Sequence, residues 1–421
     1  MYNINEGSDS KMLIEFSVGN YLSFKEIVTL SMIPTRIREH ATTHIFQPQK
    51  EIKLLKSAIV YGANASGKTN LFKALSFMTS FVKNSSKDFQ AEEAIAIEPF
   101  RLSTETIDSP SFFEVVFLHD SVQYRYGFEV DTSHVKKEWL YASAKQKEKR
   151  LFERNQQEFE LSPAFNEGKG LEQKTRPNAL FLSVVAQFNG KIATELMKWF
   201  NQIINISGLD DQYKKMSLAL LEDNTYKNIF IELIQAADLG IEDIKLIEED
   251  LFLGRRSSLP LTNVITRHKK YDENNQVTDF EDFNMATHES HGTKKLFSLL
   301  GPILTALQNG KVLFVDEFDS RLHTLLSSFI VSIFNSINQN PKNSQLIINT
   351  HDTNLLSRKL FRRDQIWFTQ KDRYGASELY SLVEYNKVRN DASFEKDYLL
   401  GKYGAIPFIP RYTFSQKGNE D

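Results

Sequence analysis

The sequence predicts an α/β fold in which helices cover a largely parallel sheet. Residues 57–61 form a short apolar strand that runs into a glycine-rich loop and then a helix. Short apolar strands at 312–315 and 346–348 alternate with helices, which is typical of a parallel sheet. Between 112 and 165, short apolar runs recur between turn signals and predict an antiparallel meander.

The remaining elements follow from periodicity. Residues 12–32 alternate as a strand pair would. From about 175 to 240, apolar residues recur at helical spacing, Ile203 and Ile204 among them, and a further helix is expected at 229–237. A helix over 293–307 stops at Asn309-Gly310, and another covers 322–337.

These elements suggest three parts. Residues 1–165 hold the glycine loop and the antiparallel meander, and residues 166–260 form a helical insertion. Residues 261–421 return to alternating helix and strand, and complete the unit that the first part begins.

Composition narrows the class of protein. With 421 residues, 41% of them hydrophobic and 25% charged, the chain is neither disordered nor fibrous. A net charge of -3 gives no global attraction to nucleic acid. Basic clusters at 145–150, 255–256 and 267–270 leave DNA open as a partner, a solvated charged face being the alternative. Without cysteine, a signal peptide or a long apolar run, we expect a soluble cytoplasmic protein with no membrane partner.

The loop itself carries a phosphate-binding pattern. Residues 62–69, Gly-Ala-Asn-Ala-Ser-Gly-Lys-Thr, follow a strand and open a helix, as this pattern requires. Its glycines let backbone N–H groups point at phosphates, and the helix N-terminus adds partial positive charge. Lys68 reaching the β- and γ-phosphates, and Thr69 offering a hydroxyl to Mg²⁺, predict ATP and Mg²⁺ as ligands. A plain glycine turn before a helix is the alternative.

Two further strands deliver polar residues to the same sheet edge. Asp316 and Glu317 end the strand at 312–315, where ligands of such sheets bind. Asp316 would hold Mg²⁺ through its water shell, and Glu317 would be the general base or the water-orienting group for attack on the γ-phosphate. His351 follows the strand at 346–348 and would contact the γ-phosphate. Structural acidic residues and a surface histidine are the alternatives.

Together these segments resemble the ABC-type ATPase heads shared by SMC, RecF and OLD-like proteins. The resemblance rests on Gly-x-Asn-x-Ser-Gly-Lys-Thr-Asn at 62–70, a signature-like Glu-Ser-His-Gly-Thr at 289–293, Asp-Glu-Phe-Asp at 316–319 and Thr-His-Asp at 350–352. Segments 20–24 and 398–407 are similar to one subgroup, the AAA-type, OLD-like ATPases of bacterial anti-phage loci, which includes the AriA component of PARIS systems and RloA-type proteins.

The resemblance implies a P-loop ATPase head with composite sites. By similarity, the nucleotide-binding residues within one chain are Gly62, Asn64, Ala65, Ser66, Gly67, Lys68, Thr69, Asn70 and Asp319. Ser290 and Gly292 would face the γ-phosphate held by a second copy, so the heads would form a dimer or a higher homo-oligomer. Position 65 is Ala where many such loops have Gly, which leaves the N–H donors of the loop in place.

The lengths of two segments distinguish among the ATPase groups that the chain resembles. The 223 residues between Lys68 and Gly292 are too few for long coiled-coil arms, and the 70 residues after His351 are too few for a fused Toprim nuclease. The resemblance therefore implies an ATPase sensor or scaffold that controls a separately encoded effector, such as a Toprim nuclease or a toxin, in response to a phage-encoded trigger. A RecF-like DNA-binding repair ATPase and a transport ATPase subunit are the alternatives.

Overall fold

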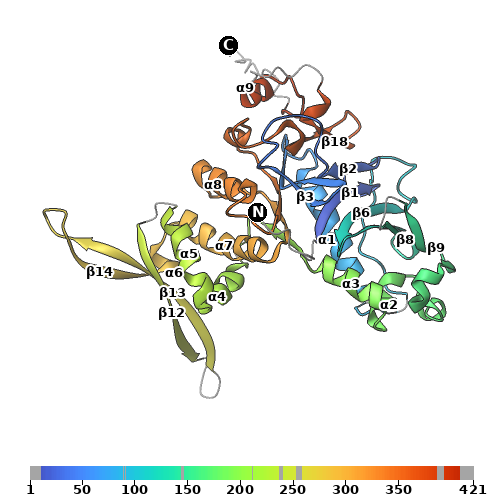
Figure 1. Cartoon of the computed structure of the whole chain (residues 1–421), viewed down its shortest axis with the longest axis horizontal. Coiled ribbons are helices and arrows are strands. Elements are labelled where there is room, and N and C mark those ends of the chain that lie inside the picture. Colours follow the sequence, from blue (N-terminus) through green and yellow to red (C-terminus); the bar gives the residue numbers. More distant parts are fainter. Residues whose placement is uncertain are drawn as a thin grey trace, which may run out of the picture.

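The computed structural model describes residues 11–88, 90, 92–143, 147–210, 212–236, 240–252, 258–385 and 393–407. Two large sheets and the helices around them form the body of the molecule, and a long three-stranded ribbon extends away from it (Figure 1).

A six-stranded sheet forms the centre of the fold. Its order is β11-β15-β16-β5-β17-β18, in which the first five strands are parallel and β18 is antiparallel to β17. The strands are β5 (Ser57–Gly62), β11 (Ile203–Ser207), β15 (Val312–Asp316), β16 (Gln345–Asn349), β17 (Ile366–Lys371) and β18 (Ser377–Ser381). The predicted strands at 57–61, 312–315 and 346–348 are thus confirmed, and β5, which leads into the glycine loop, lies in the interior of the sheet.

Both faces of this sheet are buried, which explains the nearly continuous apolar runs of its strands. In β5, Val60 joins one core cluster, while Ile59 and Tyr61 join the other. The helices of the first cluster are α1 (Lys68–Asn84), α2 (Phe181–Gln187) and α3 (Lys191–Phe200). Those of the second are α4 (Lys214–Glu222), α5 (Asn224–Ala236), α6 (Met285–His288), α7 (His291–Asn309), α8 (Thr324–Asn335) and α9 (Phe394–Leu399).

The expected meander forms a second, seven-stranded antiparallel sheet. Its order is β10-β9-β8-β7-β6-β1-β2, and α1 shares a core cluster with it. The strands are β1 (Met12–Gly19), β2 (Val28–Ser31), β6 (Ser111–His119), β7 (Val122–Val130), β8 (Val135–Ser143), β9 (Lys149–Asn155) and β10 (Glu158–Leu161), and β3 (Ile45–Gln49) pairs with β4 (Ile52–Leu55) separately. The predicted fold class, an α/β fold with a mixed sheet and an antiparallel meander, is confirmed.

The ribbon was not expected. It consists of β12 (Ile241–Phe252), β13 (Ser258–Tyr271) and β14 (Val277–Asn284), and its two hairpins point in different directions (Figure 1). The expected boundary between residues 260 and 261 falls inside β13, which pairs with β12 on one side and β14 on the other. Because this pairing joins the two sides of the boundary, the three-part division needs this correction.

Residues 166–260 contain the expected helices but are not wholly helical. Ile203 and Ile204 were expected in a helix, yet they belong to β11 and pair with Val312 and Leu313 of β15. Three isoleucines within five residues fit either period, and the free edge of β15 decides the outcome. This segment therefore contributes a strand to the central sheet.

α7 positions the signature-like segment and packs closely on α4. At Gly301, a Cβ atom would lie 2.4 Å from the backbone nitrogen of Ser217, so only glycine allows this approach. The Ser217 hydroxyl donates to the Phe297 carbonyl at 2.6 Å and accepts from the Gly301 N–H at 3.1 Å. α7 ends before Gly310, which is left-handed with φ 62°, as the predicted stop requires.

Short 3₁₀ helices connect the larger elements: η1 (Pro163–Gly168), η2 (Glu172–Lys174), η3 (Thr353–Leu355), η4 (Arg363–Gln365) and η5 (Leu382–Glu384). Within the described ranges, every helix is too short or too polar to span a bilayer.

Candidate active site

The glycine loop connects β5 to α1 and wraps too tightly for side chains at its two ends. A Cβ atom at Gly62 would lie 2.4 Å from both Ser66 Oγ and the Thr369 carbonyl oxygen, and one at Gly67 would lie 2.5 Å from Ser377 Oγ. Gly67 is left-handed with φ 114°. Ala65 also adopts a positive φ of 61°, the conformation that glycine favours at this place.

Hydroxyl groups support the loop from behind. The Ser377 hydroxyl lies 2.7 Å from the Ser66 carbonyl oxygen and 2.8 Å from Ser23 Oγ. Ser66 Oγ lies 2.6 Å from Thr369 Oγ1, and Asn70 Nδ2 donates to Ser23 Oγ at 2.7 Å. Asn70 therefore braces the loop here, and its contact with a nucleotide stays a prediction. The supporting roles of Ser23, Thr369 and Ser377 were not predicted, because these residues lie far from the loop in the sequence.

Lys68 places its ammonium group inside the loop. The residue is 5% exposed, and its Nζ donates to the carbonyl oxygens of Gly62 at 2.8 Å and Ala63 at 3.0 Å. Burial lowers the pKa of Lys68 to about 8, although nearby carboxylates, Asp316 first among them, act in the opposite direction. A phosphate oxygen could replace the carbonyls as the partner of this ammonium.

The start of α1 meets the end of β15, as predicted. Thr69 Oγ1 donates to Asp316 Oδ1 at 3.1 Å, so a hydroxyl and a carboxylate lie side by side. Asn349, at the end of β16, donates its amide N–H to the same Asp316 oxygen and accepts the Glu317 backbone N–H at 2.5 Å. Asn349 is fully buried and was not predicted. The sequence feature that could have indicated Asn349 is a polar residue at the end of an apolar strand.

Gly208 fixes the backbone at the acidic residues from the other side. It follows β11, and its N–H donates to the Asp316 carbonyl at 2.5 Å. A Cβ atom at Gly208 would lie 2.0 Å from the Glu317 carbonyl oxygen, so the position admits only glycine. Glu317 itself has φ 51°, which is uncommon outside glycine. This role was missed because the strand before Gly208 was expected to be helical.

His351 lies on the loop after β16. Its backbone N–H donates to the Asp319 carboxylate at 3.3 Å, which joins two of the predicted residues. Burial lowers the pKa of the imidazole, and the Lys68 ammonium acts in the same direction. The ring is therefore neutral at pH 7, and can donate a hydrogen bond without carrying charge.

Ser290 and Gly292 lie elsewhere, at the start of α7. Ser290 caps this helix by accepting the Thr293 N–H at 3.1 Å, and both Ser290 and His291 are exposed. A Cβ atom at Gly292 would lie 3.3 Å from the Arg321 carbonyl oxygen, so the segment that follows Asp319 passes close by. Within the described residues, no hydrogen bond joins Ser290 or Gly292 to the glycine loop of the same chain.

A cleft of about 510 Å³ borders the outer side of the loop. Residues 63–66 line it on one side and residues 404–407 on the other. The Ala405 N–H donates to Gln370 Oε1 at 2.8 Å, which holds the C-terminal segment against β17. The segment 398–407, singled out by the resemblance, therefore reaches the wall of the loop.

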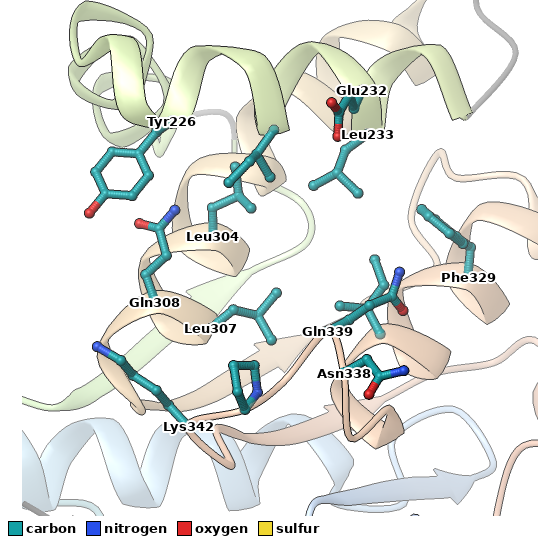
Figure 2. A pocket seen from close by; sticks show the side chains of 13 residues that line it. Tyr226, Glu232, Leu233, Leu304, Leu307, Gln308, Phe329, Asn338, Gln339 and Lys342 are labelled. Carbon is teal, nitrogen blue, oxygen red and sulfur yellow. The ribbon is translucent and has the colours of Figure 1, made fainter. Parts of the chain in front are cut away.

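A larger cleft of about 670 Å³ lies away from the loop, between α5, α7, α8 and residues 338–342. Figure 2 shows Leu304 and Leu307 beneath α5, with Tyr226 and Gln308 at one end. No residue of the predicted site lines this cleft.

Comparison with known proteins assigns the family. A family described as "AAA domain, putative AbiEii toxin, Type IV TA system" matches residues 57–357, which span the loop, Asp316, Glu317 and His351. The chain belongs to this AAA family. No curated protein sequence matches the chain.

Several solved structures share similarity with this AAA protein. The SMC head domain from Thermotoga maritima has 13% identity over 88% of this chain and 98% of its own, with a TM-score of 0.42. An SMC head bound to the C-terminal winged-helix domain of ScpA has 14% identity over 88% and 97%, with a TM-score of 0.45. An SMC head from Pyrococcus furiosus, bound to the C-terminal domain of ScpA, has 12% identity over 93% and 98%, with a TM-score of 0.38.

As an AAA-family chain, this is an ATPase-type domain, for which a nucleotide and a divalent ion are the implied ligands. The residues fit both. The absence of Cβ atoms at Gly62 and Gly67 keeps the loop tightly wound, and Lys68 offers a cation within it. The neighbouring oxygens of Thr69 and Asp316 are the hard donors that Mg²⁺ prefers.

Proposed function

We propose that this AAA protein binds ATP with Mg²⁺ and hydrolyses it slowly. One observation carries the proposal: the carboxyl edge of the parallel sheet brings Lys68 and Thr69 together with Asp316 and Glu317. Thr69 bonds directly to Asp316, and Asn349 bonds to both acidic residues. This is the location at which such sheets bind ligands.

Each residue then has a distinct task. Lys68 and the loop N–H groups bind and orient the phosphates, and Thr69 and Asp316 hold Mg²⁺. When bound, the ion supplies positive charge to the phosphate oxygens. Glu317, whose backbone Asn349 fixes, accepts a proton from the attacking water. Neutral His351 donates a hydrogen bond to a γ-phosphate oxygen.

A second copy of the chain would complete the site. The start of α7 exposes Ser290 and His291 at the N-terminus of a 19-residue helix. Such a terminus favours an anion, because its N–H groups and dipole point outward. Ser290 and Gly292 of one copy therefore suit the γ-phosphate held by the other, and ATP would act as the signal for assembly.

The proposed cellular role is a sensor or scaffold in anti-phage defence that responds to a phage-encoded trigger and controls a separate effector, a Toprim-type nuclease or a toxin. The description of the family includes a toxin of a type IV system. The ribbon offers a docking surface, because Tyr271, Val277 and Phe280 are exposed on it. Ten acidic and six basic residues give positions 241–284 a charge of -4, which suits a basic protein surface.

The alternative, a RecF-like ATPase that clamps DNA, draws little support from the ribbon. Arg267 pairs with Asp282 at 2.9 Å, Lys269 with Glu242 at 2.7 Å and Lys270 with Glu281 at 3.0 Å. Of the other basic clusters, residues 147–150 are exposed, and Arg150 pairs with Glu160 at 2.7 Å, whereas residues 145–146 and 255–256 lie outside the described residues. ATP-dependent duplex binding that weakens with salt and is lost when these three cations are neutralised would favour the DNA-binding role.

Two variants test the hydrolytic site. Glu317→Gln should keep ATP affinity, lower turnover by about 100-fold or more, and accumulate an ATP-bound dimer in light scattering. Lys68→Ala should lose ATP binding, whereas Lys73→Ala, on the same helix, should not. Normal turnover in Glu317→Gln would rule out Glu317 as the base, and unchanged affinity in Lys68→Ala would rule out the loop as the nucleotide site.

Mixing variants tests the composite site. Lys68→Ala and Ser290→Arg should each be inactive alone, since each spoils both sites of a homodimer. In a mixed dimer, one site combines the intact loop of the Ser290→Arg chain with the intact Ser290 of the other chain. The mixture should regain activity; if it stays as inactive as its components, Ser290 does not act across chains.

A further inference from the structure

A second group of ligand-type side chains lies far along the chain from the glycine loop, at the turn between β6 and β7. His119 ends β6, Asp120 opens the turn and Glu195 belongs to α3. His119 Nε2 lies 3.4 Å from Asp120 Oδ2 and 3.6 Å from Glu195 Oε2. One ligand atom from each residue falls within 4.8 Å of the others.

The His119 ring is buried, and its long contacts with Asp120 and Glu195 form no hydrogen bond. Its side chain is 3% exposed, and neither ring nitrogen forms a hydrogen bond with any residue that the structure describes. Buried polar atoms are almost always satisfied, so this ring calls for a ligand. Imidazole nitrogens are the commonest metal ligands in proteins, and the two nitrogens of this ring have no other hydrogen-bond partner among the described residues.

The two distances from the His119 ring to the carboxylates match tetrahedral coordination. Metal–nitrogen and metal–oxygen bonds of about 2.0–2.2 Å place neighbouring tetrahedral ligand atoms about 3.4 Å apart. The two distances from His119 Nε2 agree with this value. Lys198 Nζ holds the other Glu195 oxygen, Oε1, at 2.7 Å, which leaves Oε2 turned toward His119.

We propose that His119, Asp120 and Glu195 bind a divalent transition metal, for which Zn²⁺ is the best fit. An imidazole ligand suits Zn²⁺, whereas Mg²⁺ and Ca²⁺ prefer oxygen donors alone. The two carboxylates balance the charge of the ion, and a water would occupy the fourth position. The ion would tie the β6–β7 turn to α3, and so stabilise the contact between the antiparallel sheet and the helices packed on it.

The test uses the untagged full-length chain, freed of metal and without nucleotide. Calorimetric titration with Zn²⁺ should show one site per chain, and Co²⁺ in its place should give the intense visible bands of a tetrahedral ion. His119→Ala should weaken Zn²⁺ binding by more than about 100-fold and abolish these bands. The control is His134→Ala, an exposed histidine at the β7–β8 turn, which should bind as the unchanged chain does.

Two further variants keep the outcome clear. Glu195, 38% exposed, tolerates replacement without loss of the fold, so Glu195→Gln should also weaken binding if His119→Ala misfolds. Asp316→Asn alters the nucleotide site and should leave Zn²⁺ binding unchanged. The proposal would be overturned if the unchanged chain failed to bind Zn²⁺, or if His119→Ala and Glu195→Gln both bound Zn²⁺ as tightly as the unchanged chain. Loss of Zn²⁺ binding in Asp316→Asn would also overturn it.

Discussion

The Asn349 side chain accepts a hydrogen bond from the backbone N–H of Glu317 at 2.5 Å. The other end of the same amide donates to Asp316. One fully buried residue on β16 thus positions Asp316, the proposed metal-binding carboxylate at the end of β15, and Glu317, the proposed catalytic base that follows it. We infer that Asn349 is a positioning residue, since it acts through these two neighbours.

Asn349→Ala should therefore reduce turnover more than binding. Without the amide, the Glu317 backbone loses its anchor, and a small misplacement of a catalytic group costs about 100-fold in rate. We expect kcat to fall by about that factor while KM changes much less, as phosphate release assays would measure. Asn354→Ala, an exposed asparagine in the loop after His351, is the matched control. Equal kcat values in the two variants would show that Asn349 has only a packing role.

The pH dependence of ATP affinity should report on Lys68. Burial lowers its pKa to about 8, below the ordinary lysine value of 10.5, so the empty site loses this proton as pH rises through 8. Phosphates bind the charged form, so affinity should be nearly constant below about pH 7, about twofold weaker at pH 8 and about tenfold weaker at pH 9. Fluorescence titration with a labelled ATP between pH 7 and 9 measures this change.

The arginine variant provides the control, because a guanidinium stays charged over this range. Lys68→Arg should bind ATP less tightly, since the pocket is shaped for an ammonium, but with an affinity that does not vary between pH 7 and 9. The same tenfold decline in both proteins would assign the pH dependence to another group. The free energy of unfolding should change with pH in the opposite direction to ATP affinity. Between pH 8 and 10.5 the unfolded chain binds more protons than the empty folded protein, so this lysine makes folding more favourable as pH rises.

A second relationship links the ribbon to the proposed assembly surface. Glu289, next to Ser290, accepts hydrogen bonds from Thr266 Oγ1 at 2.5 Å and His268 Nε2 at 2.7 Å, both on β13. Glu289→Ala should weaken ATP-driven dimerisation by about tenfold, the worth of one charge-assisted hydrogen bond, and leave ATP affinity of the monomer unchanged. Analytical ultracentrifugation with ATP measures the first and labelled ATP the second. The control is Glu273→Ala, at an exposed position in the far turn of the ribbon. Identical dimerisation in both variants would show that the contact between Glu289 and the ribbon does not contribute to assembly.

The features predicted correctly from the sequence are those with local causes. The strands β5, β15 and β16 are short apolar runs bounded by loops, and buried parallel strands have this pattern. The glycine loop was predicted from a local pattern, Gly62 to Thr69 between a strand and a helix, although distant residues such as Thr369 and Ser377 supply the close contacts that exclude side chains at its glycines. The contact between Thr69 and Asp316 follows because both lie at the carboxyl edge of one sheet.

The features that were missed depend on distant partners. β11 is a strand because it pairs with the edge of β15, and three isoleucines within five residues cannot indicate that pairing. β14 is almost wholly exposed and has no apolar alternation, so periodicity could not predict this strand of the ribbon. Gly208 and Asn349 matter through backbone groups of residues far away in sequence, whose positions only the folded sheet defines.

A buried ion pair carries the last prediction. Glu138 is 1% exposed and accepts hydrogen bonds from Tyr126 Oη at 2.9 Å and from the Phe181 and Leu182 N–H groups at 2.6 and 2.9 Å, at the start of α2. The Arg154 guanidinium lies 3.5 Å away, fully buried. This carboxylate thus joins the antiparallel sheet to α2, and both partners need each other because neither charge reaches water.

Glu138→Ala should lower the free energy of unfolding by about 3–5 kcal/mol, because it leaves Arg154 as an unpaired buried charge. Urea denaturation measures the loss. Glu129→Ala removes the partner of Lys137 at the surface, and should cost less than about 1 kcal/mol. Replacing Glu138 and Arg154 together by methionine should recover much of the loss, since the cost lies in the unpaired charge more than in the missing pair. If the double variant is as unstable as Glu138→Ala, the hydrogen bonds at the start of α2, rather than the ion pair, account for the stability.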